Sequence, residues 1–255
     1  MKRLFTISTL LKKTGRYYFL LSFLLLLINP KTFASYIVNI SENISPQSGL
    51  DHNKNPHGLI IDLSKLIFPK VEFISYPLAR ALNITEKEKN TLLFISRTKS
   101  REDKFAWIDT IYMSNVYIYT NNNKFNLNNK NDINILESIG VLNGSSLIQT
   151  LKDANYTKNI ETVINNEQNL KKLISKRIDG WIEGEIVAEY LMKKMKINSN
   201  LFKRFGPVVQ NVTWIATAKN SDPDYIKDIT KRIKKFKESK SYEKILESYK
   251  AHNPD

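Results

Sequence analysis

Short apolar runs that suit buried strands alternate with helical patterns along most of the chain. A strand is expected at residues 36–40, a helix begins after Gly58, and a second strand follows at 71–76. Further strands are expected at 91–96, 115–120, 138–142, 161–164, 178–182 and 212–218, with helices between them and a helical pair after Pro223. This alternation predicts an α/β fold whose sheets are largely parallel.

The alternation is interrupted by a polar stretch at residues 121–134, which contains eight Asn. Such a composition suits a surface connection and not a core element. Strands and helices resume behind it as a second block, and the strand at 212–218 would lead back to the first block. We therefore expect two lobes joined by two crossings, with a ligand between them at the strand ends.

The first 34 residues have the features of a cleaved secretory signal. A basic stretch ends at Arg16, the apolar run 17–28 follows, and residues 32–34 fit the small-x-small rule before Ser35. The run is shorter than the ~20 residues that span a bilayer, which favours a cleaved signal over the alternative, an uncleaved N-terminal anchor helix. We expect an exported protein in the periplasm of a Gram-negative cell.

The net charge of +14 suggests nucleic acid as a partner, but its distribution argues against one. Six basic residues precede residue 35, where there is no acid, and without them the net charge falls to +8. The basic C-terminal stretch 231–237 keeps Ile233 and Phe236 on one apolar stripe, which is typical of a solvated amphipathic helix. We expect no nucleic-acid partner.

Residue types that carry metals and cofactors are sparse. The chain has no cysteine, which excludes disulfides, thiolate metal sites and a lipid-modified Cys. His52, His57 and His252 are scattered, and neither a Walker motif nor G-x-G-x-x-G occurs. We expect no metal and no cofactor.

Four basic side chains crowd into residues 97–104, between a strand and an aromatic segment. The stretch from Ser96 to Lys99 matches S-x-x-K, which activates a serine in some acyl-enzymes. Those enzymes also need S-D-N and K-T-G; the first is missing and the K-T-G at 13–15 lies in the expected signal. We therefore expect no enzyme here, and the basic stretch is either a solvated turn or a socket for an anion.

Six segments in a fixed order resemble bacterial extracellular solute-binding proteins of family 3, the type II periplasmic binding proteins that serve polar amino-acid uptake. They are G-L-I-I-D-L (58–63), P-L-A-R-A-L (77–82), S-R-T-K-S-R-E-D-K-F-A-W (96–107), V-L-N-G-S-S (141–146), R-I-D-G-W-I-E-G-E (177–185) and S-Y-E-K-I-L-E-S-Y (241–249). The resemblance extends over nearly the whole mature chain.

The resemblance implies two α/β lobes that close on a small ligand by a hinge motion. Lobe one would be residues 35–120 and 213–255, and lobe two would be 121–212. The implied function is capture of a small polar, carboxylate-bearing, amino-acid-like ligand for the permease of an ABC transporter, by a monomer. The alternative is an enzyme or a soluble sensory receptor, working with a separate sensor protein, that reuses the same cleft.

The resemblance also nominates residues for the ligand's carboxylate. In the pattern S/T-x-x-R, Thr98 and Arg101 match, and a guanidinium presents a planar fork of donors that fits a carboxylate. Lys99 and Lys104 would point outward. Ser145 and Ser146 stand between a strand and a helix, where they would serve as an anion site, an ordinary N-cap, or both.

The position that holds the ligand's ammonium group in amino-acid-binding members departs from the family. The resemblance implies an Asp there, and this chain has Gly184, flanked by Glu183 and Glu185. Either glutamate could reach a cation, or both could be exposed acids at a helix start. We expect Asp179 to be structural.

Four further side chains are candidates for the cleft: Tyr76, Arg80, Arg97 and Trp181. An aromatic face beside a guanidinium would line a binding cleft, and core packing of both aromatic residues is the alternative. If all three arginines near the cleft face it, the ligand would carry more than one negative group.

Overall fold

One mixed sheet of eight strands organises the part of the chain that the computed structural model describes, residues 35–255 without 122–124, 126, 129, 253 and 255. The expected signal at 1–34 lies outside the described residues. The order of the strands in the sheet is β5-β1-β6-β11-β7-β10-β8-β9. Their bounds are β1 (Tyr36–Ser41), β5 (Val71–Tyr76), β6 (Thr91–Ser96), β7 (Phe105–Asn121), β8 (Ser138–Leu142), β9 (Asn159–Val163), β10 (Gly180–Gly184) and β11 (Phe202–Ala218). A small second sheet joins β2 (Asn43–Ile44), β3 (Ser48–Leu50) and β4 (Pro56–His57).

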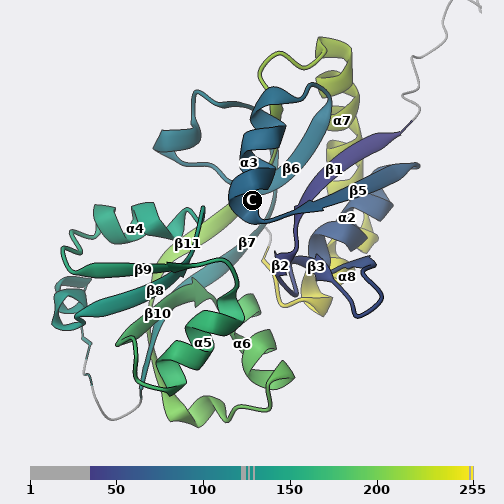
Figure 1. The fold of residues 1–255 in the computed structure, drawn as a ribbon. Coiled ribbons are helices and arrows are strands. Elements are labelled where there is room, and N and C mark those ends of the chain that lie inside the picture. The colour runs from purple at the N-terminus through teal and green to yellow at the C-terminus, as the bar shows by residue number, and fades with distance from the viewer. Residues whose placement is uncertain (1–34, 122–124, 126, 129, 253, 255) are drawn as a thin grey trace, which may run out of the picture. The chain divides into compact units, whose positions relative to one another are not determined.

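The two ends of the large sheet are parallel and its centre is antiparallel. Strand β1 pairs in parallel with β5 and β6, and β8 does so with β9 and β10. The pairs β6/β11, β11/β7 and β7/β10 are antiparallel. The expected parallel pairing therefore holds within each block, while the long strands β7 and β11 cross between the blocks side by side (Figure 1).

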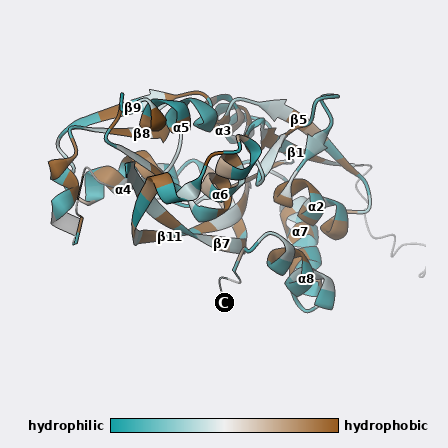
Figure 2. Cartoon of the chain, turned by 90° about the horizontal axis from the view of Figure 1, so that it is seen from below, coloured by the Kyte–Doolittle hydropathy of each residue, from teal (hydrophilic) through white to brown (hydrophobic). Residues whose placement is uncertain are grey.

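Seven α-helices of the described residues cover the sheet, and their starts follow the local sequence. Asn165 caps α5 by accepting the amide of Glu167, and Pro223 opens α7. The buried residues of α7 include Ile229 and Ile233, and Figure 2 shows hydrophilic and hydrophobic residues alternating along it. The helices are α2 (Leu59–Ile67), α3 (Leu78–Lys87), α4 (Leu147–Asp153), α5 (Asn166–Ile174), α6 (Glu185–Lys194), α7 (Pro223–Lys237) and α8 (Lys240–Ser248). Short 3-10 turns span Lys99–Arg101, Lys130–Ile135 and Ser199–Leu201.

The buried side chains form separate clusters in the two blocks. One cluster joins residues of the first block, including Leu93 and Phe105, with Ala216 from the returning strand. Two clusters of the second block draw all their buried members from residues 116–202. Each block therefore has a core of its own, as two lobes require.

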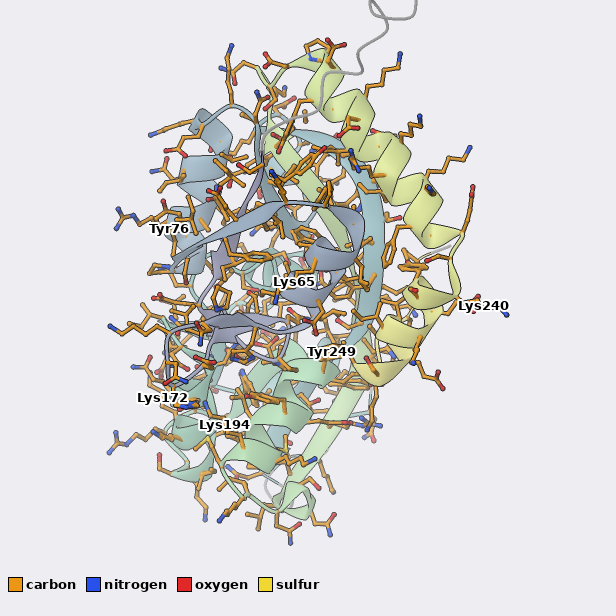
Figure 3. The ribbon with its side chains drawn as sticks, turned by 90° about the vertical axis from the view of Figure 1, so that its right-hand side faces the viewer. Lys65, Tyr76, Lys172, Lys194, Lys240 and Tyr249 are labelled. Carbon is orange, nitrogen blue, oxygen red and sulfur yellow. The ribbon has the colours of Figure 1, made fainter. Side chains whose placement is uncertain are left out.

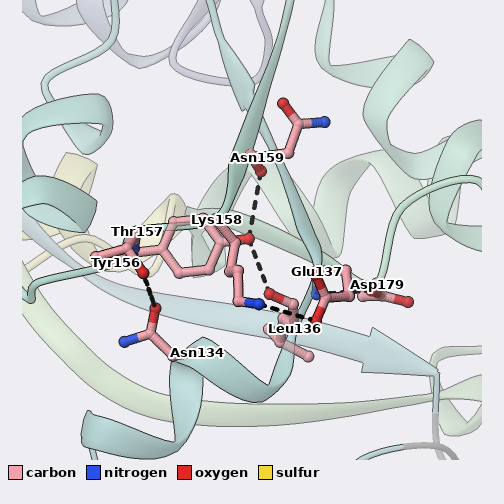
Figure 4. A network of polar contacts seen from close by, with 8 residues as sticks. All are labelled: Asn134, Leu136, Glu137, Tyr156, Thr157, Lys158, Asn159 and Asp179. Carbon is pink, nitrogen blue, oxygen red and sulfur yellow. Dashed lines mark hydrogen bonds and ion pairs between the residues drawn. The ribbon is translucent and has the colours of Figure 1, made fainter.

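Three polar contacts connect neighbouring elements of the two blocks. The carboxylate of Asp179 accepts the amide of Glu137 at 2.9 Å, and nearby the Tyr156 hydroxyl donates to the carbonyl of Leu136 at 3.0 Å (Figure 4). In the first block the Tyr249 hydroxyl, labelled in Figure 3, donates to Asp62 at 2.8 Å and ties α8 to α2. The contacts of Asp179 agree with the structural role expected for it. Over the described residues, no helix has both the length and the apolar character needed to cross a membrane.

Candidate functional site

A pocket of about 70 Å³ lies where strands of the two blocks meet, and both blocks contribute to its lining. Its apolar wall comes mainly from Ile44, Ile60, Leu78, Phe94, Ile95, Leu142 and Leu147. Its polar lining includes Ser96, Arg101, Ser114, Ser145, Ser146, Glu183 and Asn211. A larger hollow of about 550 Å³ lies beside α6, but it contains none of the nominated residues. The smaller pocket is the candidate site because it brings residues far apart in sequence to one point.

Arg101 supplies the positive charge of the pocket and bridges the two blocks. Its Nη1 donates to the Ser96 carbonyl at 2.8 Å, and its Nη2 donates to the Gly144 carbonyl at 2.6 Å. Burial lowers the pKa of Arg101 to about 10, so the guanidinium stays charged at neutral pH. Two of its five N–H groups are thus engaged with carbonyls, which leaves donors for a ligand.

The turn that Arg101 contacts needs a glycine. Gly144 has φ of 79°, and a Cβ there would stand 3.2 Å from the backbone of Ala79 in α3. The close approach places the next two residues, Ser145 and Ser146, in the pocket lining. The Ser145 hydroxyl accepts the Leu147 amide at 3.2 Å, so this serine acts as a cap while it lines the pocket.

Glu183 is the one acidic residue among the described residues that line the pocket. Its side chain is buried, with 9% exposure, and its carboxylate accepts the Gly184 amide at 2.8 Å. Burial raises the pKa of Glu183 to about 7, against the opposing effect of the Gly184 amide and the nearby Asn166 side chain. The Asn166 amide nitrogen itself completes no hydrogen bond of standard geometry in the described structure. Near neutral pH the carboxyl is therefore only partly ionised.

Gly184 leaves open space in the pocket. Its backbone, at φ of −65° and ψ of 140°, suits any residue. A Cβ there would meet the Ser114 hydroxyl oxygen at 3.5 Å, an ordinary van der Waals distance. Ser114 is 1% exposed, and within the described structure its hydroxyl has no hydrogen-bond partner. The position could hold an acid, and its neutral neighbours are this buried hydroxyl and, at 4.0 Å, the carbonyl oxygen of Asn115.

Trp181, nominated as a ligand contact, lies in the core. It is fully buried in the second block beside Leu170 and Leu191, with its ring 5.6 Å from that of Tyr119. Trp181 is the second residue of β10, a strand flanked by β7 and β8, and lies away from the Gly184 end that borders the pocket. The structure thus favours the core-packing alternative for Trp181.

Glu185 and Thr98 also lie outside the pocket lining. Glu185 opens α6, where it accepts the Asn115 amide at 3.3 Å and lies 3.5 Å from His252. The hydroxyl of Thr98 is 3.1 Å from that of Ser100. Both side chains are satisfied within their own surroundings.

The two other arginines point away from the pocket and stack on aromatic rings. Arg97 is exposed, pairs with Glu102, which raises its pKa, and lies 4.8 Å from the ring of Trp214. Arg80 is exposed and lies 5.2 Å from the ring of Tyr76, which packs against the core of the first block. The cleft with three arginines considered from sequence is not formed in the described structure, so the pocket has one fixed cation.

Sequence reasoning missed Ser114 and Asn211, which come from the long crossing strands. The Ser96 hydroxyl donates to the Asn211 side chain at 2.5 Å, and both residues line the pocket. Single polar residues in apolar strands gave no spacing that marks them as functional. They directly precede the expected strands 115–120 and 212–218, and the structure places both in the middle of the longer strands β7 and β11. Among the described residues no group of His, Asp and Glu is arranged to hold a metal.

Comparison with protein families decides the classification. The family model of bacterial extracellular solute-binding proteins, family 3, matches residues 36–252. The chain belongs to this family. The two-lobe α/β fold of periplasmic binding proteins, expected from the sequence, is thereby confirmed. No match was found among curated proteins.

Solved structures that resemble this family member agree with that fold. An ancestral arginine-binding protein bound to arginine has a TM-score of 0.74 at 21% identity, over 85% of this chain and 98% of its own. A substrate-binding protein of an ABC uptake transporter from Streptococcus pneumoniae, with bound histidine, has a TM-score of 0.74 at 16% identity, over 84% and 92%. A histidine kinase sensor domain has a TM-score of 0.78 at 13% identity, over 87% and 98%. At these identities the likeness shows the fold.

Proposed function

We propose that this protein captures a small carboxylate-bearing solute in the periplasm and delivers it to the permease of an ABC transporter. The observation that carries the proposal is the buried, charged Arg101 in a pocket shared by both blocks. A guanidinium with free donors binds a carboxylate through paired, charge-assisted hydrogen bonds. Membership of the solute-binding family and relatives named for amino-acid and ABC uptake support the same function.

The mechanism we propose is closure of two lobes on the ligand. The lobes would be residues 35–120 with 213–255, and residues 121–212, with β7 and β11 as the hinge. The separate cores of the two blocks support two lobes, with residues 116–119 at the end of β7 packing into the core of the second. A ligand that contacts Arg101 on one lobe and Ser145 on the other binds the closed form better, and this difference in affinity shifts the population toward closure.

The cellular setting follows from the family and from the N-terminal sequence. An extracellular solute-binding family fits export by the signal at residues 1–34 and cleavage near Ser35. A monomer that meets its permease at the membrane would then need no metal, cofactor or nucleic acid. In this setting the permease recognises the closed, loaded form.

A catalytic function of the same pocket is the alternative, and one observation favours it. Glu183 has a pKa of about 7, which suits a general acid or base. Turnover of a bound solute, followed by chromatography, would distinguish an enzyme from a carrier. A carrier returns its ligand unchanged.

The proposal is tested by a thermal-shift screen of the purified protein with amino acids, organic acids, small peptides and sugars. A ligand at 100 times its Kd adds about 2.7 kcal/mol to the free energy of unfolding. The Arg101→Ala variant should lose on the order of 100-fold in affinity, because a buried charge–carboxylate contact is removed. Arg80→Ala, an exposed arginine outside the pocket, is the matched control. Equal affinity of wild type and Arg101→Ala would refute the assignment.

A further inference from the structure

The polar groups of the pocket are distributed unevenly around it. One side holds a charged guanidinium, Arg101, whose contacts are backbone carbonyls. The other side, at the end of β10, holds Gly184 and the buried Glu183, whose carboxylate is engaged with a backbone amide. The pocket therefore offers a ligand a fixed positive charge but no freely exposed negative charge among the residues described.

The space at Gly184 is bordered by a neutral donor. The Ser114 hydroxyl lies 3.5 Å from the point where a Cβ of residue 184 would stand, is almost fully buried, and has no hydrogen-bond partner among the described residues. A buried hydroxyl without a partner costs free energy, which a ligand oxygen placed there would recover. An ammonium group in that place would instead be desolvated beside a neutral hydroxyl.

The rest of the lining sets the size and polarity of the ligand. The wall of the first block is apolar, with Ile44, Ile60, Leu78 and Phe94. The cavity of about 70 Å³ suits a molecule of only a few heavy atoms. A carboxylate on Arg101, an uncharged oxygen on the adjacent carbon and a short aliphatic body would match the charged, neutral and apolar parts of this lining.

We propose that the pocket selects short-chain α-hydroxy or α-oxo carboxylates over amino acids of the same carbon skeleton. The inference rests on the proposed function and names the class of its ligand. The carboxylate binds Arg101, the α-oxygen accepts a hydrogen bond from Ser114, and the aliphatic body contacts the apolar wall.

Glu183 offers the opposing possibility, in which its carboxylate holds an ammonium group. Burial raises its pKa to about 7, so this role would make amino-acid binding stronger above neutral pH than below it. Among the described residues that line the pocket, Arg101 is the only charged side chain besides Glu183. Binding of an α-hydroxy acid to Arg101 and Ser114 should not follow this pH dependence.

The test compares matched solutes by isothermal titration calorimetry. The first set is lactate, pyruvate and alanine, and the second is α-hydroxyisovalerate, α-oxoisovalerate and valine, each below and above neutral pH. We expect an α-hydroxy or α-oxo acid to bind on the order of 100-fold more tightly than the amino acid of its set, because the desolvated ammonium finds only neutral acceptors at Gly184 and no freely exposed carboxylate. The inference would be overturned if the amino acid binds more tightly than the hydroxy and oxo acids of the same set and its affinity rises with pH.

Substitution at Gly184 should reverse the preference. Gly184→Asp places a carboxylate where the backbone and the available space accept a side chain, so valine should gain affinity and α-hydroxyisovalerate should lose it. Gly184→Asn, of the same size but uncharged, should lose the hydroxy acid without gaining valine. If Gly184→Asp fails to fold, the wild-type sets and Gly184→Asn still decide the question.

Failure of this inference can be separated from failure of the proposed function. If other polar solutes bind in a manner that needs Arg101 but neither set does so, the ligand class is wrong and the carrier function stands. If valine binds and Glu183→Gln abolishes its binding, the ammonium is held by Glu183 and the inference is overturned. If no solute binds and Arg101→Ala behaves as wild type, both are wrong.

Discussion

The two segments that bring charge to the pocket differ in how deeply their tryptophans are buried. In residues 96–107, Arg101 lines the pocket while Trp107 is half-buried beside Arg97 and Trp214. In β10, Trp181 is fully buried in a core, and Glu183 loses part of its charge to burial two residues later. Each segment pairs a tryptophan with a charge, yet only the first keeps its charge fully ionised.

The difference follows from the position of each segment in the sheet. Strand β10 lies between β7 and β8, with helices packed against it, so its side chains are removed from water. Arg101 stands in a short turn after the end of β6, where backbone carbonyls of Ser96 and Gly144 solvate its charge. The pocket therefore has a net positive field, which favours an anionic ligand.

The different burial of the two tryptophans should have its largest effect on stability. Trp181→Ala should lower the free energy of unfolding by about 3–5 kcal/mol, since it leaves a cavity in a packed core. Trp107→Ala should cost clearly less, because that ring is half-buried. Urea unfolding of the two variants measures the difference, and Trp181→Phe controls for loss of the aromatic ring. Similar costs for the two alanine variants would show that the tryptophans are not differently placed.

The buried carboxyl of β10 predicts a pH dependence of stability. The pKa of Glu183 is about 7 in the folded protein and near the ordinary 4.5 when unfolded. Between these values the native state binds more protons, so the free energy of unfolding falls as pH rises from 4.5 through 7. Glu183→Gln removes this loss, so its stability relative to wild type should improve by up to about 3 kcal/mol across that range.

Urea unfolding of wild type and Glu183→Gln at several pH values checks this second prediction. Glu185→Gln is the matched control, because Glu185 is a neighbour of the same residue type with no such burial. The prediction is wrong if the difference between wild type and Glu183→Gln does not change with pH. In that event β10 would hold its charge as freely as the turn at Arg101 does.

A smaller effect is expected at Ser114, on the side of the pocket next to β10. Ser114→Ala removes a buried hydroxyl without a described partner, so the free protein should gain about 1 kcal/mol of stability. The same variant should bind an α-hydroxy acid more weakly, because the ligand oxygen loses its donor. Thermal unfolding with and without ligand measures both effects. A loss of stability in the free variant would show that the hydroxyl is already satisfied.

Local patterns in the sequence predicted the two blocks and most strands, and the family resemblance nominated Arg101, which lines the pocket. Apolar runs such as 91–96 and 138–142 match β6 and β8, and the S/T-x-x-R spacing led to the arginine that lines the pocket. Strand β7 begins ten residues earlier than expected, at Phe105. Many side chains between Phe105 and Asn115 are only half-buried, so their pattern is neither apolar nor strictly alternating.

The sequence could not predict in which direction single side chains point. Arg97 and Arg101 occur in one basic stretch, and nothing in their spacing shows that the first stacks on Trp214 while the second reaches Gly144. Those partners are more than forty residues away in sequence; Trp214 comes near through the pairing of β11 with β6, and Gly144 through the approach of the second block. Trp181 was misplaced for a related reason, because the flanking of β10 on both sides is a property of the whole sheet.

Within residues 96–107, the two arginines Arg97 and Arg101 should differ strongly in their contribution to ligand affinity, and Arg97→Ala should have the smallest effect of the variants. Arg97→Ala should leave ligand affinity within about twofold of wild type, since this exposed side chain pairs with Glu102 and stacks on tryptophan outside the pocket. Arg101→Ala, four residues away in the same basic stretch, should lose on the order of 100-fold. Calorimetric titration of the two variants with the same ligand gives both numbers. If the two variants lose comparable affinity, the ligand binds the surface cluster of Arg97, Trp107 and Trp214. The pocket lined by Arg101 is then not the binding site.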